Sequence, residues 1–235
     1  MNHPLPKRVV AEAVGTAMLL AAVVGSGIMG ERLAAGNTAI ALLANTMATG
    51  AALVALILTF GPISGAHFNP AVTLTVAWQR GLPWRDVPPY IVAQVGGAFA
   101  GVAVAHIMFG LPLFFASRHN RSGSSQVFSE FVATFGLLAV IWGCVRFRPS
   151  AVPFAVAAYI TAAYWFTAST SFANPAVTLA RSASDTFAGI RPLDAPAFIV
   201  AQLAGAFVAT AFFGWLARTD EQPQTRSDTL HRQLR

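Results

Sequence analysis

Six apolar windows, each of about 18–23 residues, most constrain the fold of this chain of 235 residues. At about 1.5 Å of rise per residue, a helix over each window crosses a hydrocarbon core about 30 Å thick. Only 10% of the residues are charged, against about a quarter in a soluble domain, which excludes an ordinary cytosolic enzyme. The chain is therefore predicted to be an all-α membrane protein with six transmembrane helices, at about 9–29, 38–60, 89–110, 126–146, 151–170 and 196–217.

The basic residues predict the orientation of these spans. An even number of spans places both termini on one side, and ten Lys and Arg residues flank that face against five on the other. Because basic residues are enriched in cytoplasmic loops, both termini are predicted to be cytoplasmic, in the inner (plasma) membrane. The net charge of +6 is too dispersed along the chain to indicate nucleic-acid binding. The polar segment 219–235 is predicted to be a disordered cytoplasmic tail.

The two halves of the chain resemble each other. Each half contains three spans, and because three is an odd number, the second half must start from the opposite side of the membrane. The sequence therefore predicts an inverted 3+3 repeat over 7–117 and 125–218, a plan that places a functional site at the midplane. Three landmarks recur in the same order: AEAVGT at 11–16 returns as SEFVAT at 129–134, NPAVTL occurs at 69–74 and 174–179, and IVAQ at 91–94 returns at 199–202.

Two apolar segments, 69–78 and 174–184, are too short to cross the membrane. Each begins with Asn-Pro-Ala, where Asn is a good N-cap and Pro suits the first helical position, so both are interpreted as re-entrant half-helices whose N-termini meet near mid-membrane. One NPA tripeptide alone would indicate only a helix start, but two copies at matching positions of a repeat indicate a pore. The predicted pore motifs are Asn69, Pro70, Ala71, Asn174, Pro175 and Ala176.

The predicted junction favours neutral solutes. Each half-helix N-terminus carries about half a positive charge, which repels cations, and the side-chain amides of Asn69 and Asn174 can donate to the oxygen of a neutral molecule. The sequence contains no nucleotide-binding loop and no converging set of catalytic or metal-ligating residues. With a single cysteine, Cys144, it offers neither a disulfide nor a site of several thiolates. A passive channel without enzymatic activity, cofactor or metal is therefore predicted.

Ionisable residues inside the windows are also repeated. Glu12 and Glu130 occupy equivalent points of the two halves, and both are predicted to accept hydrogen bonds from backbone N–H groups of the re-entrant loops rather than to relay protons. His67 is a candidate for the cytoplasmic mouth, either as a pH sensor or, as the favoured interpretation, as a histidine fixed by loop hydrogen bonds. Gly97 and Gly101 form a GxxxG pair, which predicts a close contact between helices.

With two NPA boxes, one Glu on the first helix of each half and the phrase SGAHFNPAVT at 64–73, the chain resembles the aquaporin (major intrinsic protein) family along about 7–218. The resemblance implies a homotetramer in a lipid bilayer, with one pore per subunit for water, glycerol or other small neutral solutes.

The resemblance also implies a narrow aromatic/arginine filter on the extracellular side of the NPA centre. When the filter positions of the family are transferred by their spacing from the NPA motifs, they fall on Thr49, Ala162, Ser171 and Val177, none of which is aromatic, histidine or arginine. An alternative alignment with an insertion after Ala176 would make Arg181 the filter arginine. The ungapped alignment is preferred, and Arg181, four residues after Val177 on the same helix face, is a candidate for the outer pore.

Such a filter is predicted to be wide and less polar, so that water loses hydrogen bonds with poor compensation while a larger triol contacts several sites at once. With the sequence NPAVTLAR at 174–181, the chain looks most like the bacterial arsenic-resistance (S-type) aquaporins. That resemblance implies permeation by arsenite, As(OH)3, and by antimonite and methylarsenicals. The alternatives are a glycerol/water facilitator and a non-conducting adhesion or scaffold protein with the same fold.

Overall fold

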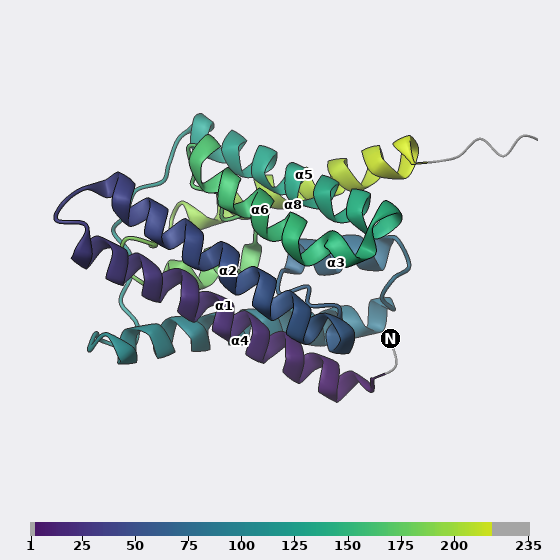
Figure 1. Cartoon of the computed structure of the whole chain (residues 1–235), viewed down its shortest axis with the longest axis horizontal. Coiled ribbons are helices and arrows are strands. Elements are labelled where there is room, and N and C mark those ends of the chain that lie inside the picture. Colours follow the sequence, from purple (N-terminus) through teal and green to yellow (C-terminus); the bar gives the residue numbers. More distant parts are fainter. Residues whose placement is uncertain (1–2, 218–235) are drawn as a thin grey trace, which may run out of the picture.

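Two groups of three long helices lie side by side in the computed structural model, which describes residues 3–217 (Figure 1). Helix α2 of the first group packs against α6 of the second. The first group consists of α1 (Leu5–Leu33), α2 (Thr38–Ser64) and α4 (Val87–Met108), and the second of α5 (Ser124–Phe147), α6 (Val152–Phe166) and α8 (Ala195–Leu216).

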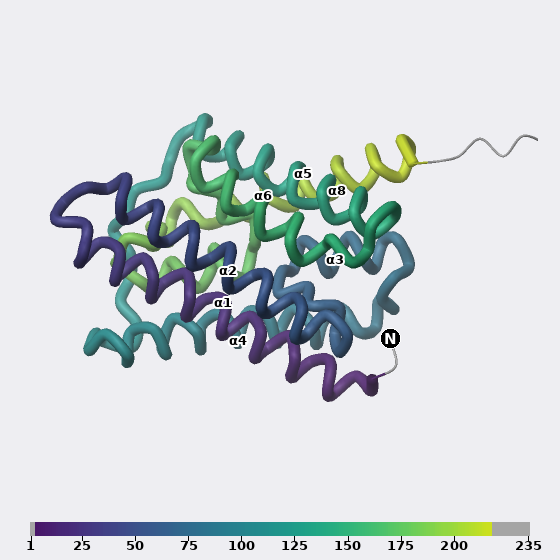
Figure 2. The backbone as a smooth tube through the Cα atoms, viewed as in Figure 1, coloured from purple at the N-terminus to yellow at the C-terminus, as the bar shows by residue number. Residues whose placement is uncertain are grey.

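Two short helices, α3 (Pro70–Trp78) and α7 (Pro175–Arg181), lie between these groups and point away from each other. The described chain begins and ends at the same end of the molecule, here called the terminal end, and α3 extends towards it while α7 extends towards the opposite, far end (Figure 2). Each half thus contributes two long helices, a short one and a third long one. The prediction of an all-α fold with two half-helices in an inverted 3+3 repeat is confirmed.

Five helical segments in residues 3–217 are long and apolar enough to cross a membrane: α1, α2, α4 with the turn η1 (Trp84–Asp86) before it, α5 and α8. Helix α6 has 15 residues, or about 22 Å at 1.5 Å per residue. The turn η2 (Pro149–Ala151) runs directly into α6 and brings the pair close to the thickness of a hydrocarbon core. Together they complete the sixth span.

Several predicted boundaries are wrong by about one turn. Helix α2 continues past residue 60 to Ser64, with Pro62 inside its last turn, and Gly65, with a φ of 91°, caps it by donating to the Gly61 carbonyl. Helix α6 ends at Phe166 rather than at 170, because Thr167 is extended and turns the chain inward. Helix α7 ends at Arg181 rather than at 184. The predicted tail at 219–235 lies outside the described residues.

Glycines allow α1 and α4 to approach each other closely. A Cβ atom on Gly97 would collide with the Ala13 carbonyl oxygen, and one on Gly101 with the Ala17 carbonyl oxygen. In lipid, such small residues let backbones pack closely where a hydrophobic driving force between helices is absent. The GxxxG pair therefore lies at the α1–α4 contact, as its spacing predicts.

We expect Gly97→Leu to lower the free energy of unfolding by about 1–3 kcal/mol, since the added side chain forces the backbones of α1 and α4 apart. The measurement is the thermal unfolding midpoint of the detergent-solubilised protein. Gly96→Leu is the matched control, because a Cβ atom on Gly96 meets nothing within 4 Å. Equal midpoints for the two variants would contradict the close packing of α1 on α4.

Candidate pore

The carboxylate of Glu12 holds the first re-entrant loop. It is fully buried and accepts hydrogen bonds from the backbone N–H groups of His67 (3.0 Å) and Phe68 (2.7 Å). The Ser64 hydroxyl (2.6 Å) and the Gln94 amide (2.8 Å) donate to the same carboxylate. The extra turn of α2 is what brings Ser64 to this position. Donors that would be costly to leave unpaired inside a membrane are thus paired.

The carboxylate of Glu130 holds the second re-entrant loop in the same way. It is fully buried and accepts from the backbone N–H groups of Phe172 (2.9 Å) and Ala173 (2.8 Å) and from the Gln202 amide (2.6 Å). These are the contacts that a loop-supporting role requires. They place the two residues before Asn174 at a fixed point in the interior.

The two half-helices meet tip to tip. The Asn69 side chain caps α3 by accepting from Ala71 N–H (2.9 Å), and its amide nitrogen donates to the Ala173 carbonyl in the other half (2.8 Å). Asn174 caps α7 by accepting from Ala176 N–H (3.0 Å), and its amide nitrogen donates to the Phe68 carbonyl (2.7 Å). Each amide has two hydrogens, so one remains for a solute. Two helix N-termini, each with a partial positive charge, therefore face one point.

A cavity of about 460 Å³ passes this junction, because both asparagines line it. Most of its wall is apolar, with branched aliphatic side chains from α1, α2, α3, α5 and α6. Its terminal end is lined by Gln79, Gly81 and Trp142, and its far end by Thr49, Ser171 and Arg181. A mostly apolar conduit with a few polar contacts is suited to small neutral molecules.

His67 lines the cavity on the terminal side of the junction. Its Nδ1 lies 3.1 Å from the Thr73 hydroxyl, and its ring centroid lies 5.5 Å from that of Tyr90. The backbone bond to Glu12 fixes the same residue from the other side. His67 thus combines a place at the cavity wall with a position held by loop hydrogen bonds.

Three of the four filter positions inferred by spacing line the far end of the cavity: Thr49, Ser171 and Val177. Ala162 does not, since it lies on the exposed face of α6, and Tyr164 faces the cavity instead, with its hydroxyl 3.4 Å from that of Thr49. Side chains two residues apart on a helix point about 200° away from each other, so Tyr164 faces inward where Ala162 faces outward. The Ser171 hydroxyl is buried without a hydrogen-bond partner among the described residues, which leaves it for a solute.

Arg181 also lines the far end of the cavity, one turn beyond Val177, and it is only 2% exposed. Its Nε donates to the Ala188 carbonyl, and its guanidinium carbon lies 3.4 Å from the centroid of the Phe172 ring. The guanidinium therefore stacks on a ring of the wall. Arginine and aromatic side chains do line this end of the cavity, although the positions inferred by spacing include none.

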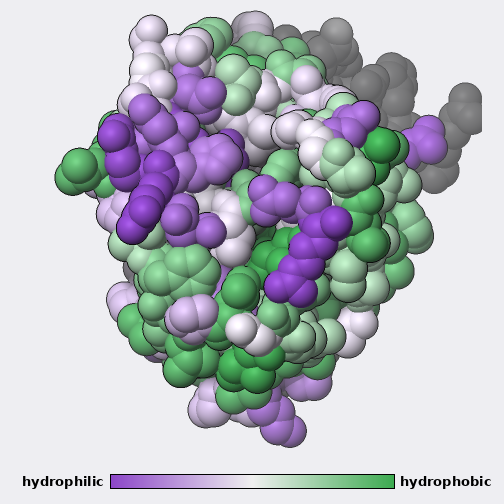
Figure 3. Space-filling model, turned by 90° about the vertical axis from the view of Figure 1, so that its left-hand side faces the viewer, coloured by the Kyte–Doolittle hydropathy of each residue, from purple (hydrophilic) through white to green (hydrophobic). Residues whose placement is uncertain are grey.

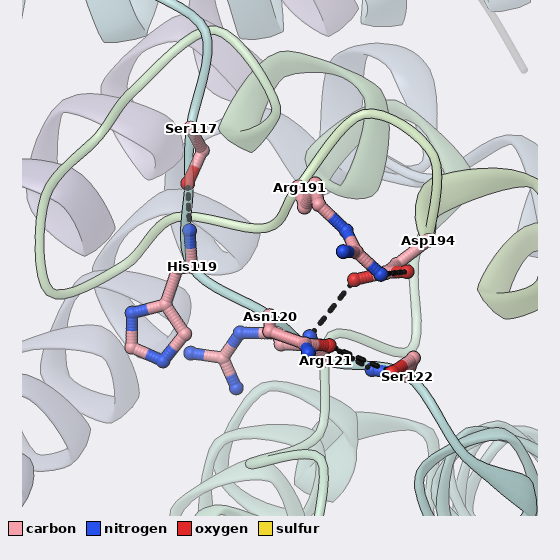
Figure 4. A network of polar contacts seen from close by, with 7 residues as sticks. All are labelled: Ser117, His119, Asn120, Arg121, Ser122, Arg191 and Asp194. Atoms are coloured by element: carbon pink, nitrogen blue, oxygen red, sulfur yellow. Dashed lines mark hydrogen bonds and ion pairs between the residues drawn. The ribbon is translucent and has the colours of Figure 1, made fainter.

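Hydrophilic residues gather over the far end of the molecule, and hydrophobic residues occupy much of its rim (Figure 3). Here the loop between α4 and α5 is tied to the rest of the mouth through Arg121, whose backbone N–H donates to Asp194 (2.9 Å) (Figure 4). The Arg121 guanidinium donates to the carbonyls of Gly189 (2.8 Å) and Ser169 (3.0 Å), so the loop is connected to the segment that carries Ser171.

Charged groups at this mouth shift each other's ionisation. Burial raises the pKa of Asp194, but hydrogen bonds from the Arg191 guanidinium and the Arg121 N–H outweigh it, so that the pKa is lowered and the carboxylate stays charged. Partial burial, and then the positive charges of Arg121 and Arg181, lower the pKa of His119. The Arg121 side chain extends towards the His119 ring (Figure 4). This histidine is therefore neutral at pH 7, and the mouth carries its positive charge on arginines.

Comparison with known proteins places this arrangement in a family. The sequence matches the Major intrinsic protein family over residues 2–150 and 144–234. It is 58% identical over 212 residues to Aquaglyceroporin AqpS of Rhizobium meliloti (strain 1021), across 90% of this chain and 91% of that protein. It is 35% identical over 149 residues to Aquaporin NIP1-3 of Oryza sativa subsp. japonica, across 60% of this chain and 51% of that protein.

The fold is also shared with a solved structure. The X-ray structure of the aquaglyceroporin from Plasmodium falciparum superposes with a TM-score of 0.73 at 23% identity, covering 89% of this chain and 96% of that one. Fold, paired half-helices and sequence agree, so the chain is a membrane channel for small solutes and not an enzyme. It belongs to the major intrinsic protein family, as a channel of the aquaporin and glycerol-facilitator type.

Proposed function

We propose that this chain is a passive channel for small uncharged hydroxylated solutes and that arsenite, As(OH)3, is the principal one. Antimonite and methylarsenicals belong to the same class of solute. The observation that carries the proposal is the cavity of about 460 Å³ that passes both asparagine amides, with Val177 in the first turn of α7 and the Arg181 guanidinium stacked against its wall. Support also comes from the 58% identity to a protein named an aquaglyceroporin.

Charge selection takes place at the junction of α3 and α7. Two helix N-termini point at the same part of an apolar cavity, where screening by water is weak, so a cation is repelled. A neutral hydroxide carries no net charge, so the helix N-termini do not repel it. Its oxygen atoms can accept hydrogen bonds from the free amide hydrogens of Asn69 and Asn174. A single file of polar contacts thus replaces part of the hydration of the solute.

Selection among neutral solutes takes place at the far end of the cavity. The hydroxyls of Thr49, Tyr164 and Ser171 lie on one part of the wall, and Val177 adds an apolar surface. A molecule with three hydroxyl groups can exchange hydrogen bonds with several of these at once, and As(OH)3 is such a molecule at neutral pH. Water touches fewer of them, and each unpaired group costs about 1–3 kcal/mol.

We also propose that the chain assembles as a homotetramer in the plasma membrane with both termini cytoplasmic. The distribution of basic residues along the sequence supports the orientation, since ten Lys and Arg flank the spans on the side predicted to be cytoplasmic, against five on the other side. Large apolar side chains on the outer faces, such as Val92, Phe128 and Val200, are more than 60% exposed and suit contact with lipid or with other copies of the chain.

The test is solute uptake by proteoliposomes that contain the purified protein. Arsenite uptake at pH 7 and swelling in glycerol are both expected to exceed those of protein-free vesicles, because both solutes are neutral and hydroxylated. Glycerol uptake without arsenite uptake would remove arsenite and leave the glycerol/water facilitator. Vesicles no more permeable than the protein-free controls to arsenite, glycerol and water would leave the adhesion or scaffold protein.

A further inference from the structure

The ring of Phe172 is held in place from several sides. Its backbone N–H donates to the buried Glu130 carboxylate (2.9 Å), and the side chain is 5% exposed. The ring packs edge-on against Phe198, with centroids 5.4 Å apart and planes at 85°. The guanidinium carbon of Arg121 lies 5.0 Å from the same centroid. Phe172 is therefore a rigid part of the cavity wall.

The Arg181 side chain contacts this ring and one backbone carbonyl. Among the described residues, the hydrogen bond formed by its side chain runs from Nε to the Ala188 carbonyl, and its guanidinium carbon stacks 3.4 Å above the Phe172 centroid. Beside it lies a cavity of about 460 Å³. A guanidinium that loses its stacking partner regains solvation by extending into this space, where a cation is better hydrated than in the wall.

The repeat shows that this contact belongs to one half only. The residue two positions before each asparagine is a ring residue that donates to the buried glutamate: His67 in the first half and Phe172 in the second. Each packs against a ring on the next long helix, at 5.5 Å for His67 with Tyr90. Seven residues after the asparagine, however, the first half has a valine, Val76, where the second has Arg181.

We propose that Phe172 is a specificity-determining residue, which acts as a positioning residue for Arg181. Its ring keeps the guanidinium against the wall, so that the far end of the cavity stays wide enough for bulky neutral solutes. The inference rests on the proposed function, since it names the feature that lets a channel retain an arginine at its mouth and still pass a solute larger than water.

The first test follows the guanidinium directly and does not depend on conduction. Phenylglyoxal modifies accessible arginines, and the extent of modification of Arg181 is read by peptide mass spectrometry in the wild type, Phe172→Leu and Phe115→Leu. We expect Arg181 to react about ten-fold faster in Phe172→Leu, because the loss of a partly desolvated cation–π contact changes the population of the exposed guanidinium by about this factor. Phe115→Leu is the matched control, because Phe115 stacks on His106 at the same end of the molecule and does not line the cavity. Equal rates in all three proteins would overturn the proposal.

The second test is a double-mutant cycle in proteoliposomes. Phe172→Leu is expected to reduce glycerol and arsenite uptake about ten-fold relative to water flux, and Phe172→Leu/Arg181→Met is expected to restore the ratio, because no cation is left to enter the cavity. If the double variant stays as poor as the single one, Phe172 only shapes the wall and the proposal is wrong. If the wild type conducts nothing while the modification rates differ as expected, the proposed function fails and the positioning of Arg181 stands.

Discussion

Val177→Arg is expected to abolish most arsenite and glycerol uptake while water flux persists. Val177 is 5% exposed, lines the cavity and lies three residues after Asn174 in the first turn of α7. A long cationic side chain at this point extends into the cavity, because the Phe172 ring in the wall already carries the Arg181 guanidinium. The new charge lies one helical turn from Arg181, and the two guanidinium groups repel each other. This repulsion keeps the new side chain away from the wall and narrows the opening.

The measurement is uptake by proteoliposomes, with arsenite and glycerol compared with osmotic water flux in the same preparation. Val177→Met is the matched control, because it adds length without charge and is expected to retain measurable arsenite uptake. Arsenite uptake in Val177→Arg equal to that of the wild type would mean that Val177 does not line the selective part of the pore. The selective part would then lie at Arg181, one turn further out.

The helices and the half-helices could be predicted from sequence because each rests on a local signal. An apolar window long enough to cross a bilayer predicts a span, and Asn-Pro-Ala at a helix start predicts the cap that Asn69 and Asn174 form. The repeat then places the two starts opposite each other without any knowledge of contacts. Glu12 and Glu130 follow from the same reasoning, since buried loop N–H groups need acceptors.

The residues at the far end of the cavity could not be predicted in this way. Whether Ala162 or Tyr164 faces the cavity depends on the rotation of α6, and spacing along the chain does not give that rotation. The stacking of Arg181 on Phe172 depends on how the re-entrant loop turns before Asn174. A signal for Phe172 was nevertheless present, because it occupies the place of His67 in the repeat. Arg121 has no local signal, since its partners lie in loops far along the chain.

Glu130→Leu is expected to have the largest effect on folding. It removes the acceptor of three buried donors, the backbone N–H groups of Phe172 and Ala173 and the amide of Gln202. The two backbone N–H groups are left without a partner, while the Gln202 amide keeps its hydrogen bond to the Thr178 hydroxyl (2.8 Å). A buried donor left without a partner costs about 1–3 kcal/mol, so two of them represent a considerable part of the stability of a typical domain, about 5–15 kcal/mol. The loop that ends at Asn174 would no longer be held at the junction.

The measurement is the thermal unfolding midpoint in detergent, together with the fraction of protein that elutes as a single species. Glu130→Gln separates charge from hydrogen bonding, since its one carbonyl oxygen can accept from part of the set while its NH2 group faces other donors. Its midpoint is expected to lie between those of the wild type and Glu130→Leu. Glu31→Gln, at an exposed position of α1, is the matched control and is expected to change stability by less than about 0.5 kcal/mol. A Glu130→Leu protein that unfolds at the wild-type temperature would show that other contacts hold the second loop, and with it Phe172 and Asn174, in the membrane interior.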